Sequence, residues 1–217
     1  MARIIALFFD GTWNTPLDVD KQTNVYSLFD KSDEEKNGVF LKEYFDGVGT
    51  KGNFFKRLLG GIGGYGISEN IRNAYKYLIE KNYDRNTDQL FVFGFSRGAY
   101  TARSLVGFIE QVGVLDKDKL VLDRNLCFDD FIDEAYRIYI EKGSNTLEKY
   151  LNDSVGAQFN GDNQKIIVYF LGVWDTVGSL GMPISCLKFL TKDKIKFHNT
   201  ELPDNVVHAR QALALHE

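Results

Sequence analysis

Ser96 lies in a glycine-flanked motif whose residue types suit a serine nucleophile. The motif reads GFSRG over residues 94–98 and follows an apolar run from Leu90 to Phe93. After it, hydrophobic residues recur at helical spacing as far as a stop at Gly113. A strand, a G-x-S-x-G turn and a helix together form a nucleophile elbow, in which the glycines let strand and helix approach closely. The pattern therefore predicts a nucleophilic Ser96, and the alternative is a serine that only caps a helix.

A serine hydroxyl becomes nucleophilic when a base takes its proton and an acid orients that base, so two further residues are needed. Asp175 fits the acid because it lies just beyond the apolar run IIVYFLGV at 166–173, as Ser96 lies beyond its own run. The alternative for Asp175 is an Asx turn that helps to end the strand. Of the 3 histidines, His198 follows a short alternating segment and is the predicted base, with His208 as second candidate.

The oxyanion formed in such a reaction is stabilised by two backbone N–H groups. One belongs to the residue after the nucleophile, which is Arg97. The other comes from a loop at the end of an earlier strand, where Gly11 or Thr12 is well placed. A glycine at position 11 would let the backbone approach a substrate, and Asp10 could brace the loop.

The composition argues against several classes of function. The chain of 217 residues has a net charge of -4 and no dense Lys/Arg tract, so a nucleic-acid partner is not expected. The 2 cysteines, Cys127 and Cys186, lie far apart without the spacing of metal ligands. The expected chemistry requires no metal or organic cofactor.

The N-terminal apolar run does not have the form of a signal peptide. It covers Ile4 to Phe9 and stops at Asp10, and no small-residue cleavage site follows. No apolar run in the sequence approaches the length of about 20 residues that spans a bilayer. We therefore expect a chain that is cytoplasmic as synthesised, and any export would need a leaderless route.

Hydrophobic patterning predicts an α/β fold with a mostly parallel central sheet flanked by helices. Strands are expected at 3–9, 39–45, 90–93 and 165–173, and helices at 24–29, 67–79, 99–113, 128–141 and 147–151. A last helix is expected to begin at Asp204 or Asn205. Its apolar residues would be Val206, Ala209 and Leu213. The 3 prolines mark no linker, so 1–217 is expected to be a single domain, with a helical cap insertion at about 115–160.

The sequence resembles a known family over nearly its whole length. The resemblance is carried by FFDGTWN, YFDGVGT, GFSRGAYTARSLVGFIEQVG, GVWDTVGSLG, FHNTEL and HARQALALHE, which occur in this order. They are similar to α/β-hydrolase domains related to the first class of type VI secretion lipase effectors, long labelled a domain of unknown function. The most specific block is GFSRGAYTAR.

The resemblance implies an α/β-hydrolase fold and a Ser-Asp-His esterase or phospholipase that works through an acyl-enzyme. By motif it supports Ser96, Asp175 and, in the FHNT block, His198. It also implies a secretion-apparatus or immunity protein as partner. The family usually continues past an ALAxDE block, whereas His216 stands here at the acidic position and Glu217 is the last residue. Either the C-terminal end of the domain is truncated or the chain is a minimal member.

Two other functions fit parts of the sequence. The run FFDGT at 8–12 is similar to the first strand of haloacid-dehalogenase-like phosphatases, which bind magnesium. Those enzymes need Asp-x-Asp, and Phe8 occupies the position of the first aspartate. A hydrolase fold can also lose its chemistry and persist as a binding or structural module. Magnesium dependence would favour the first of these alternatives, and inactivity on all esters would favour the second.

Overall fold

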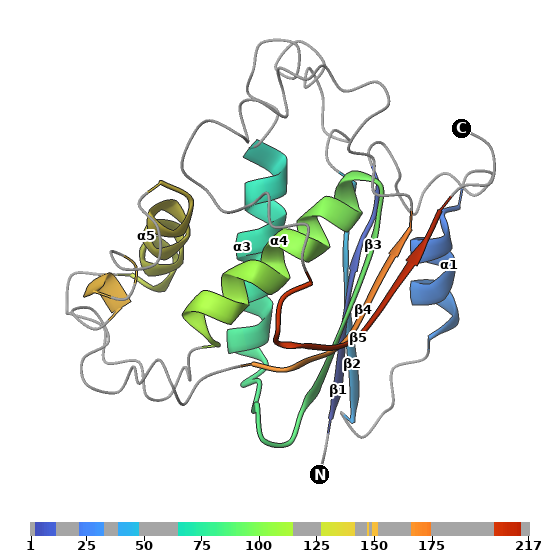
Figure 1. Cartoon of the computed structure of the whole chain (residues 1–217), viewed down its shortest axis with the longest axis horizontal. Helices are drawn as coiled ribbons and strands as arrows, with labels where there is room; N and C mark the ends of the chain where they lie inside the picture. The colour runs from blue at the N-terminus through green and yellow to red at the C-terminus, as the bar shows by residue number, and fades with distance from the viewer. Residues whose placement is uncertain are drawn as a thin grey trace.

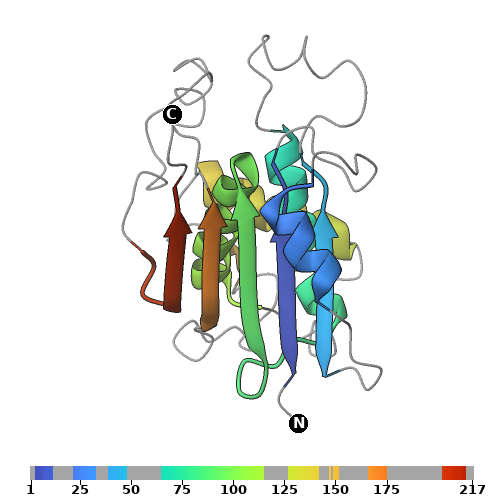
Figure 2. The ribbon, with the colours of Figure 1, turned by 90° about the vertical axis from the view of Figure 1, so that its right-hand side faces the viewer.

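Five parallel strands form the centre of the computed structural model, which describes residues 3–11, 22–32, 39–47, 65–114, 127–141, 147, 149–151, 166–174 and 202–213. They are β1 (Ile4–Phe9), β2 (Phe40–Phe45), β3 (Gln89–Phe95), β4 (Val168–Trp174) and β5 (Val206–Ala212). The order across the sheet is β2-β1-β3-β4-β5, and each neighbouring pair is parallel. Figure 2 shows the strands running in one direction. The predicted α/β fold with a parallel sheet is confirmed.

Helices cover both faces of this sheet. They are α1 (Asn24–Lys31), α3 (Tyr65–Glu80), α4 (Arg97–Val112) and α5 (Phe128–Glu141), and residues 147 and 149–151 are also helical. Figure 1 shows α3, α4 and α5 on one side of the sheet and α1 on the other. The helices expected at 24–29, 67–79, 99–113 and 128–141 are thus confirmed, with α3 beginning two residues earlier than the pattern indicated.

Strand β1 is buried on both faces, which explains its nearly continuous apolar sequence. Ile5, Leu7 and Phe9 belong to the large core beneath α3, α4 and α5. The alternate residues Ala6 and Phe8 belong to a smaller core beneath α1. Because β1 and β3 are both central, the loops that follow them emerge side by side at the carboxyl edge of the sheet.

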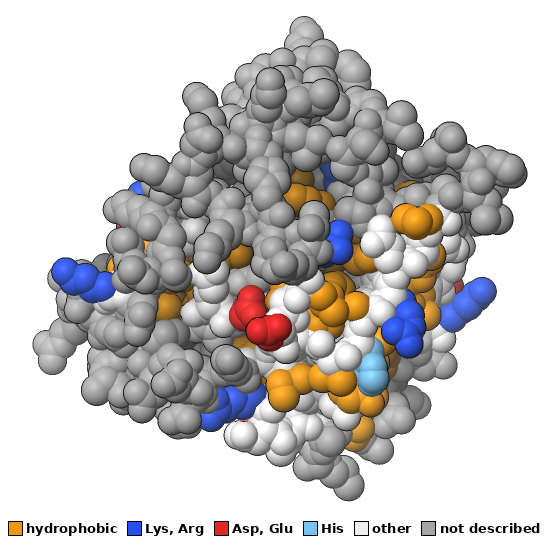
Figure 3. Space-filling model, viewed as in Figure 1, with side chains coloured by type: hydrophobic (Ala, Val, Ile, Leu, Met, Phe, Trp, Pro, Cys, Tyr) orange, Lys and Arg blue, Asp and Glu red, His pale blue; other side chains and the backbone are white. Residues whose placement is uncertain are grey.

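The last element differs from the sequence prediction. Residues Val206–Ala212 form the edge strand β5 rather than a helix capped by Asp204 or Asn205. Val206 pairs with Val168 and Ala212 with Trp174, so the segment continues the parallel sheet. It is exposed for most of its length, and Figure 3 shows hydrophobic side chains reaching the surface of this side of the molecule among scattered charged ones.

A partly buried ion pair lies at the amino edge of the sheet, opposite the loops that follow the strands. Arg3 Nε and Nη2 donate to the two carboxylate oxygens of Asp88 at 3.0 and 2.5 Å. The same guanidinium donates to the carbonyls of Lys81 and Asn82, at 3.0 and 2.7 Å, just after α3 ends. Asp88 holds the pKa of Arg3 above its usual value through this hydrogen bond. One arginine thus joins the start of β1 to the connection between α3 and β3.

Asp88→Ala is expected to lower the free energy of unfolding by about 3 kcal/mol, because it leaves a partly buried guanidinium without its anion. The side chain of Asp88 is 1% exposed and that of Arg3 is 28% exposed. As a control, Asp129→Asn removes the exposed pair with Lys76 and is expected to cost at most about 1 kcal/mol. Urea denaturation measures both, and equal losses would contradict the difference in burial.

Candidate active site

Ser96 forms a sharp turn between the end of β3 and the start of α4. Its backbone has φ 54° and ψ -118°, and Asn82 is the other non-glycine residue with positive φ in the part of the chain that the structure describes. Its N–H donates to the carbonyl of Trp174 at 3.0 Å, which ties the turn to the end of β4. Although Ser96 occupies the N-cap position of α4, its side chain makes no cap hydrogen bond. The alternative of a serine that caps a helix through its hydroxyl is therefore wrong.

The two glycines of the motif are required by close backbone contacts. A Cβ placed on Gly94 would lie 2.5 Å from the carbonyl oxygen of Gly98 and 2.7 Å from Cα of Ala99. A Cβ on Gly98 would lie 2.1 Å from the carbonyl oxygen of Phe9 and 2.6 Å from that of Asp10. Real Cβ atoms do not approach other atoms so closely. Glycine at both positions thus lets α4 begin directly against β3 and against the end of β1.

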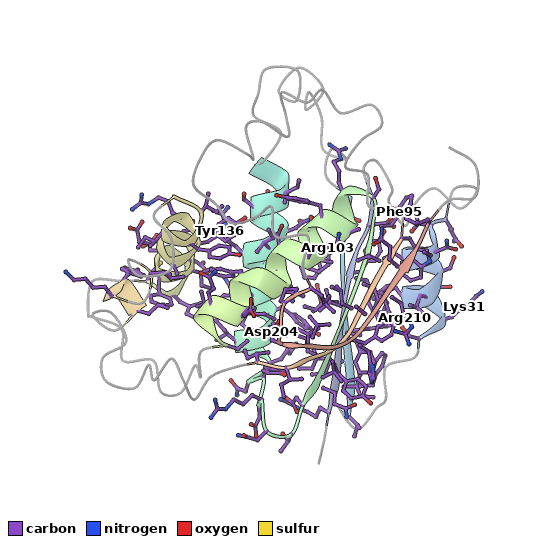
Figure 4. The ribbon with its side chains drawn as sticks, viewed as in Figure 1. Lys31, Phe95, Arg103, Tyr136, Asp204 and Arg210 are labelled. Atoms are coloured by element: carbon purple, nitrogen blue, oxygen red, sulfur yellow. The ribbon has the colours of Figure 1, made fainter. Side chains whose placement is uncertain are left out.

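The carboxyl ends of β1, β3 and β4 lie at the same level along one edge of the sheet. Gly94 pairs with Phe9 of β1 and with Val173 of β4, and Phe95 pairs with Trp174. Figure 4 labels Phe95 at the end of β3, where α4 begins. Ligands of open parallel sheets bind beyond this edge. Asp10 and Gly11 after β1 and Ser96 after β3 therefore lie in the region where chemistry is expected.

The amide groups proposed for the oxyanion lie at the start of α4 and in the loop after β1. Arg97 is the first residue of α4 and is 7% exposed. The N–H of Gly11 donates to Asp10 Oδ1 at 2.6 Å. Thr12, the third candidate, lies outside the described residues. In this structure the Gly11 amide is thus engaged by a carboxylate.

Comparison with known proteins identifies the family. Over residues 3–217 the sequence matches the family model for the type VI secretion system phospholipase effector Tle1-like catalytic domain. The chain belongs to this family. The expected relationship to type VI lipase effectors is thus confirmed, and the chain is a catalytic domain of phospholipase type by family.

The Tle1-like domain also has individual relatives. It is 26% identical over 233 residues to the uncharacterized protein YEL023C of Saccharomyces cerevisiae, covering 98% of this chain and 31% of that protein. A crystal structure of an uncharacterized protein from Pseudomonas aeruginosa is 18% identical with a TM-score of 0.45, covering 98% of this chain and 35% of that chain. The Tle1 effector bound to the VgrG spike is 19% identical with a TM-score of 0.44, covering 97% and 45%. This chain spans less than half the length of these relatives.

The described part of the Tle1-like domain does not bring a histidine to Ser96. His208 is exposed on β5, pairs with Phe170 and makes an edge-to-face contact with the ring of Tyr169 at 5.5 Å. Phe170 pairs in turn with Phe91, five residues before Ser96, which corresponds to about 16 Å along a strand. His208 is therefore poorly placed to act as the base.

The predicted acid and base, Asp175 and His198, lie outside the described residues. Asp175 directly follows Trp174, whose carbonyl accepts the N–H of Ser96. Within the described ranges no group of three His, Cys, Asp or Glu side chains could hold a metal ion. Over the same residues, no helix has both the length and the apolar character needed to cross a membrane.

Two residues that the sequence analysis missed contact the loop after β1. Thr23 Oγ1 donates to Asp10 Oδ2 at 2.7 Å, and the hydroxyl of Tyr44 donates to the same oxygen at 2.5 Å. Burial and the hydrogen bond to Asp10 raise the pKa of Tyr44 far above its usual value, so the phenol stays a donor. A threonine just before the helical pattern at 24 could have been recognised as an N-cap, whereas no sequence signal pairs Tyr44 with Asp10.

Proposed function

We propose that the chain is the catalytic domain of a serine-dependent carboxylic ester hydrolase that acts on phospholipids. The observation that carries the proposal is the backbone of Ser96, which is held at positive φ without a side-chain cap at the start of α4. Strain of this kind persists only where the surrounding structure imposes it, and it is concentrated at functional sites. Membership of the Tle1-like family supplies the phospholipase class.

In the proposed reaction, Ser96 Oγ attacks the ester carbonyl carbon while His198 takes the hydroxyl proton. Asp175 orients the imidazole and stabilises its protonated form. The resulting oxyanion accepts hydrogen bonds at the N-terminus of α4, where Arg97 provides the amide and the helix dipole favours negative charge. The protonated histidine then gives its proton to the leaving alcohol. Water next attacks the carbonyl carbon of the acyl-enzyme while the histidine takes its proton, and the histidine returns that proton to Ser96 Oγ as the acid leaves.

Family membership also supports a proposal about delivery. Effectors of type VI secretion are carried by a secretion apparatus, and the Tle1 effector has been solved bound to the VgrG spike. We infer a secretion-apparatus partner for the whole protein. Binding of the full-length protein to a spike protein, measured by co-purification, tests this part of the proposal.

Hydrolysis of short- and long-chain nitrophenyl esters and of phosphatidylcholine vesicles tests the chemistry. We expect activity that is unchanged by EDTA, a preference for long acyl chains, and inactivation by a fluorophosphonate that labels Ser96. Mass spectrometry of the labelled peptide identifies the modified residue. Activity that depends on magnesium would favour the phosphatase-like alternative. A protein that cleaves none of these substrates and resists the fluorophosphonate would instead be a binding module.

A further inference from the structure

Asp10 is a buried carboxylate beside the candidate active site. It is 2% exposed, and its two oxygens accept hydrogen bonds from three different elements. The donors are the N–H of Gly11 in the loop after β1, the hydroxyl of Thr23 before α1, and the hydroxyl of Tyr44 on β2. An ionised carboxylate has only acceptor sites and can receive all three at once. A side chain buried in this way costs free energy unless its bonds are all made.

Thr23 extends this arrangement into α1. Its Oγ1 accepts the N–H of Tyr26 at 3.0 Å, which makes it the N-cap of the helix, and its hydroxyl hydrogen goes to Asp10. The ring of Tyr44 packs against Tyr26 and Phe29 of the same helix, at 5.5 and 5.2 Å between centroids. The start of α1 and the end of β2 are thus both oriented toward the carboxylate.

The backbone of Asp10 also touches the start of α4. Its carbonyl oxygen lies 2.6 Å from where a Cβ of Gly98 would be, and its N–H donates to the carbonyl of Phe45 at 3.1 Å. Gly98 is two residues after Ser96. A shift of the loop after β1 must therefore be transmitted to the turn that holds the nucleophile, because close-packed interiors do not absorb such shifts.

We propose that Asp10 is a positioning residue: its carboxylate fixes the Gly11 peptide and so sets the loop after β1 against the start of α4. This inference rests on the proposed function, and it assigns Asp10 no contact with substrate. The Gly11 amide serves as an anchor of the loop, and the amide proposed for the oxyanion is that of Arg97 at the start of α4. Asp10 acts on the rate of the chemical step through the placement of the start of α4, rather than through substrate binding.

Asp10→Leu tests the role because it keeps the branched shape of the side chain and removes both acceptors. The Gly11 N–H and the hydroxyls of Thr23 and Tyr44 then lose their common acceptor, so the loop must turn the Gly11 peptide toward another one. Misplacing groups that stabilise the oxyanion costs about 100-fold to 1,000-fold in turnover. We expect kcat on a nitrophenyl ester to fall about 100-fold with KM within about threefold. The rate of fluorophosphonate labelling at Ser96 should fall in parallel.

Lys42→Met is the matched structural control. The ammonium of Lys42 donates to the carbonyls of Phe29 and Ser32, so it joins the same two elements, β2 and α1, at the opposite end of the helix. We expect this variant to have a lower Tm while kcat of the folded protein stays within about threefold of wild type. Equal effects of Asp10→Leu and Lys42→Met on kcat at equal loss of Tm would overturn the positioning role.

Tyr44→Phe tests the same role if Asp10→Leu does not fold. It removes one donor to Asp10 and keeps the ring, and we expect kcat to fall about 3-fold to 10-fold. An unchanged kcat in Tyr44→Phe, or an unchanged kcat in folded Asp10→Leu, would overturn the inference. If instead the proposed function is wrong, Ser96→Ala remains as active as wild type. An inactive Ser96→Ala beside a fully active Asp10→Leu refutes the positioning role alone.

Discussion

Replacing Ser96 by alanine is expected to reduce turnover of every ester substrate about a millionfold while the protein stays folded. Loss of the nucleophile alone costs a serine hydrolase about as much as loss of the whole triad, because base and acid then have nothing to activate. The measurement is kcat of purified wild type and Ser96→Ala on one nitrophenyl ester, with circular dichroism to verify the fold. Similar turnover in the two proteins would show that Ser96 is not the nucleophile.

The strained backbone of Ser96 provides a matched control for this variant. A residue with a Cβ pays about 1–3 kcal/mol to hold an unfavourable φ and ψ, and glycine adopts positive φ without that penalty. Ser96→Gly is therefore expected to be as inactive as Ser96→Ala but more stable by about 1 kcal/mol. Denaturant unfolding of the two inactive variants measures the difference. Equal stability of the two variants would mean that the backbone at position 96 is not strained, contrary to what a nucleophile elbow requires.

The strand, turn and helix around Ser96 could be predicted because their signals are local. The glycines at 94 and 98, the apolar run before them and the helical spacing after them all lie within one short stretch. The structure places β3 and α4 where this pattern indicated, and it adds the steric reason for both glycines. Here local sequence preference and tertiary structure agree.

Strand β5 could not be predicted in the same way. Only Val206 and Ala209 of this strand are half-buried, and they are three residues apart, which imitates the spacing of one helix face. An edge strand that is exposed on most of its surface shows no alternation of apolar and polar residues. The segment is a strand because it pairs with β4, and such a non-local contact leaves little trace in the sequence.

The hydrogen-bond partners of Asp10 beside the candidate site could not all be predicted either, because some of them are distant in the sequence. Asp10 was correctly expected at the end of a buried strand, but its hydrogen bond to Tyr44 joins residues that are 34 positions apart in the sequence. The same carboxylate accepts the N–H of Gly11, an amide that the sequence pattern had suggested for the oxyanion. Residue type and position beside a strand thus predicted that Asp10, Gly11 and Ser96 lie at the carboxyl edge of the sheet. They did not predict that the Gly11 amide is engaged by a carboxylate, because that depends on the direction of a single peptide group.

Gly98→Ala is expected to lower the free energy of unfolding by about 3 kcal/mol or more and to lower activity with it. The new Cβ would meet the carbonyl oxygens of Phe9, at the end of β1, and of Asp10, just after it. These are backbone atoms and cannot rotate away as a side chain would. Overpacking a close contact costs about 1–3 kcal/mol even where side chains can adjust. Since α4 must move away from β1, the turn at Ser96 moves too, and kcat is expected to fall about 100-fold.

Gly107→Ala is the control for this substitution, because it makes the same change in the same helix. A Cβ at Gly107 would lie 3.0 Å from the hydroxyl of Tyr139, the far end of a side chain that can shift. Alanine also favours a helix interior by about 1 kcal/mol over glycine, which offsets the tighter contact. We expect stability within about 1 kcal/mol of wild type and unchanged kcat. If Gly98→Ala behaved like Gly107→Ala in urea denaturation and turnover, the contact between α4 and the end of β1 would not constrain the nucleophile.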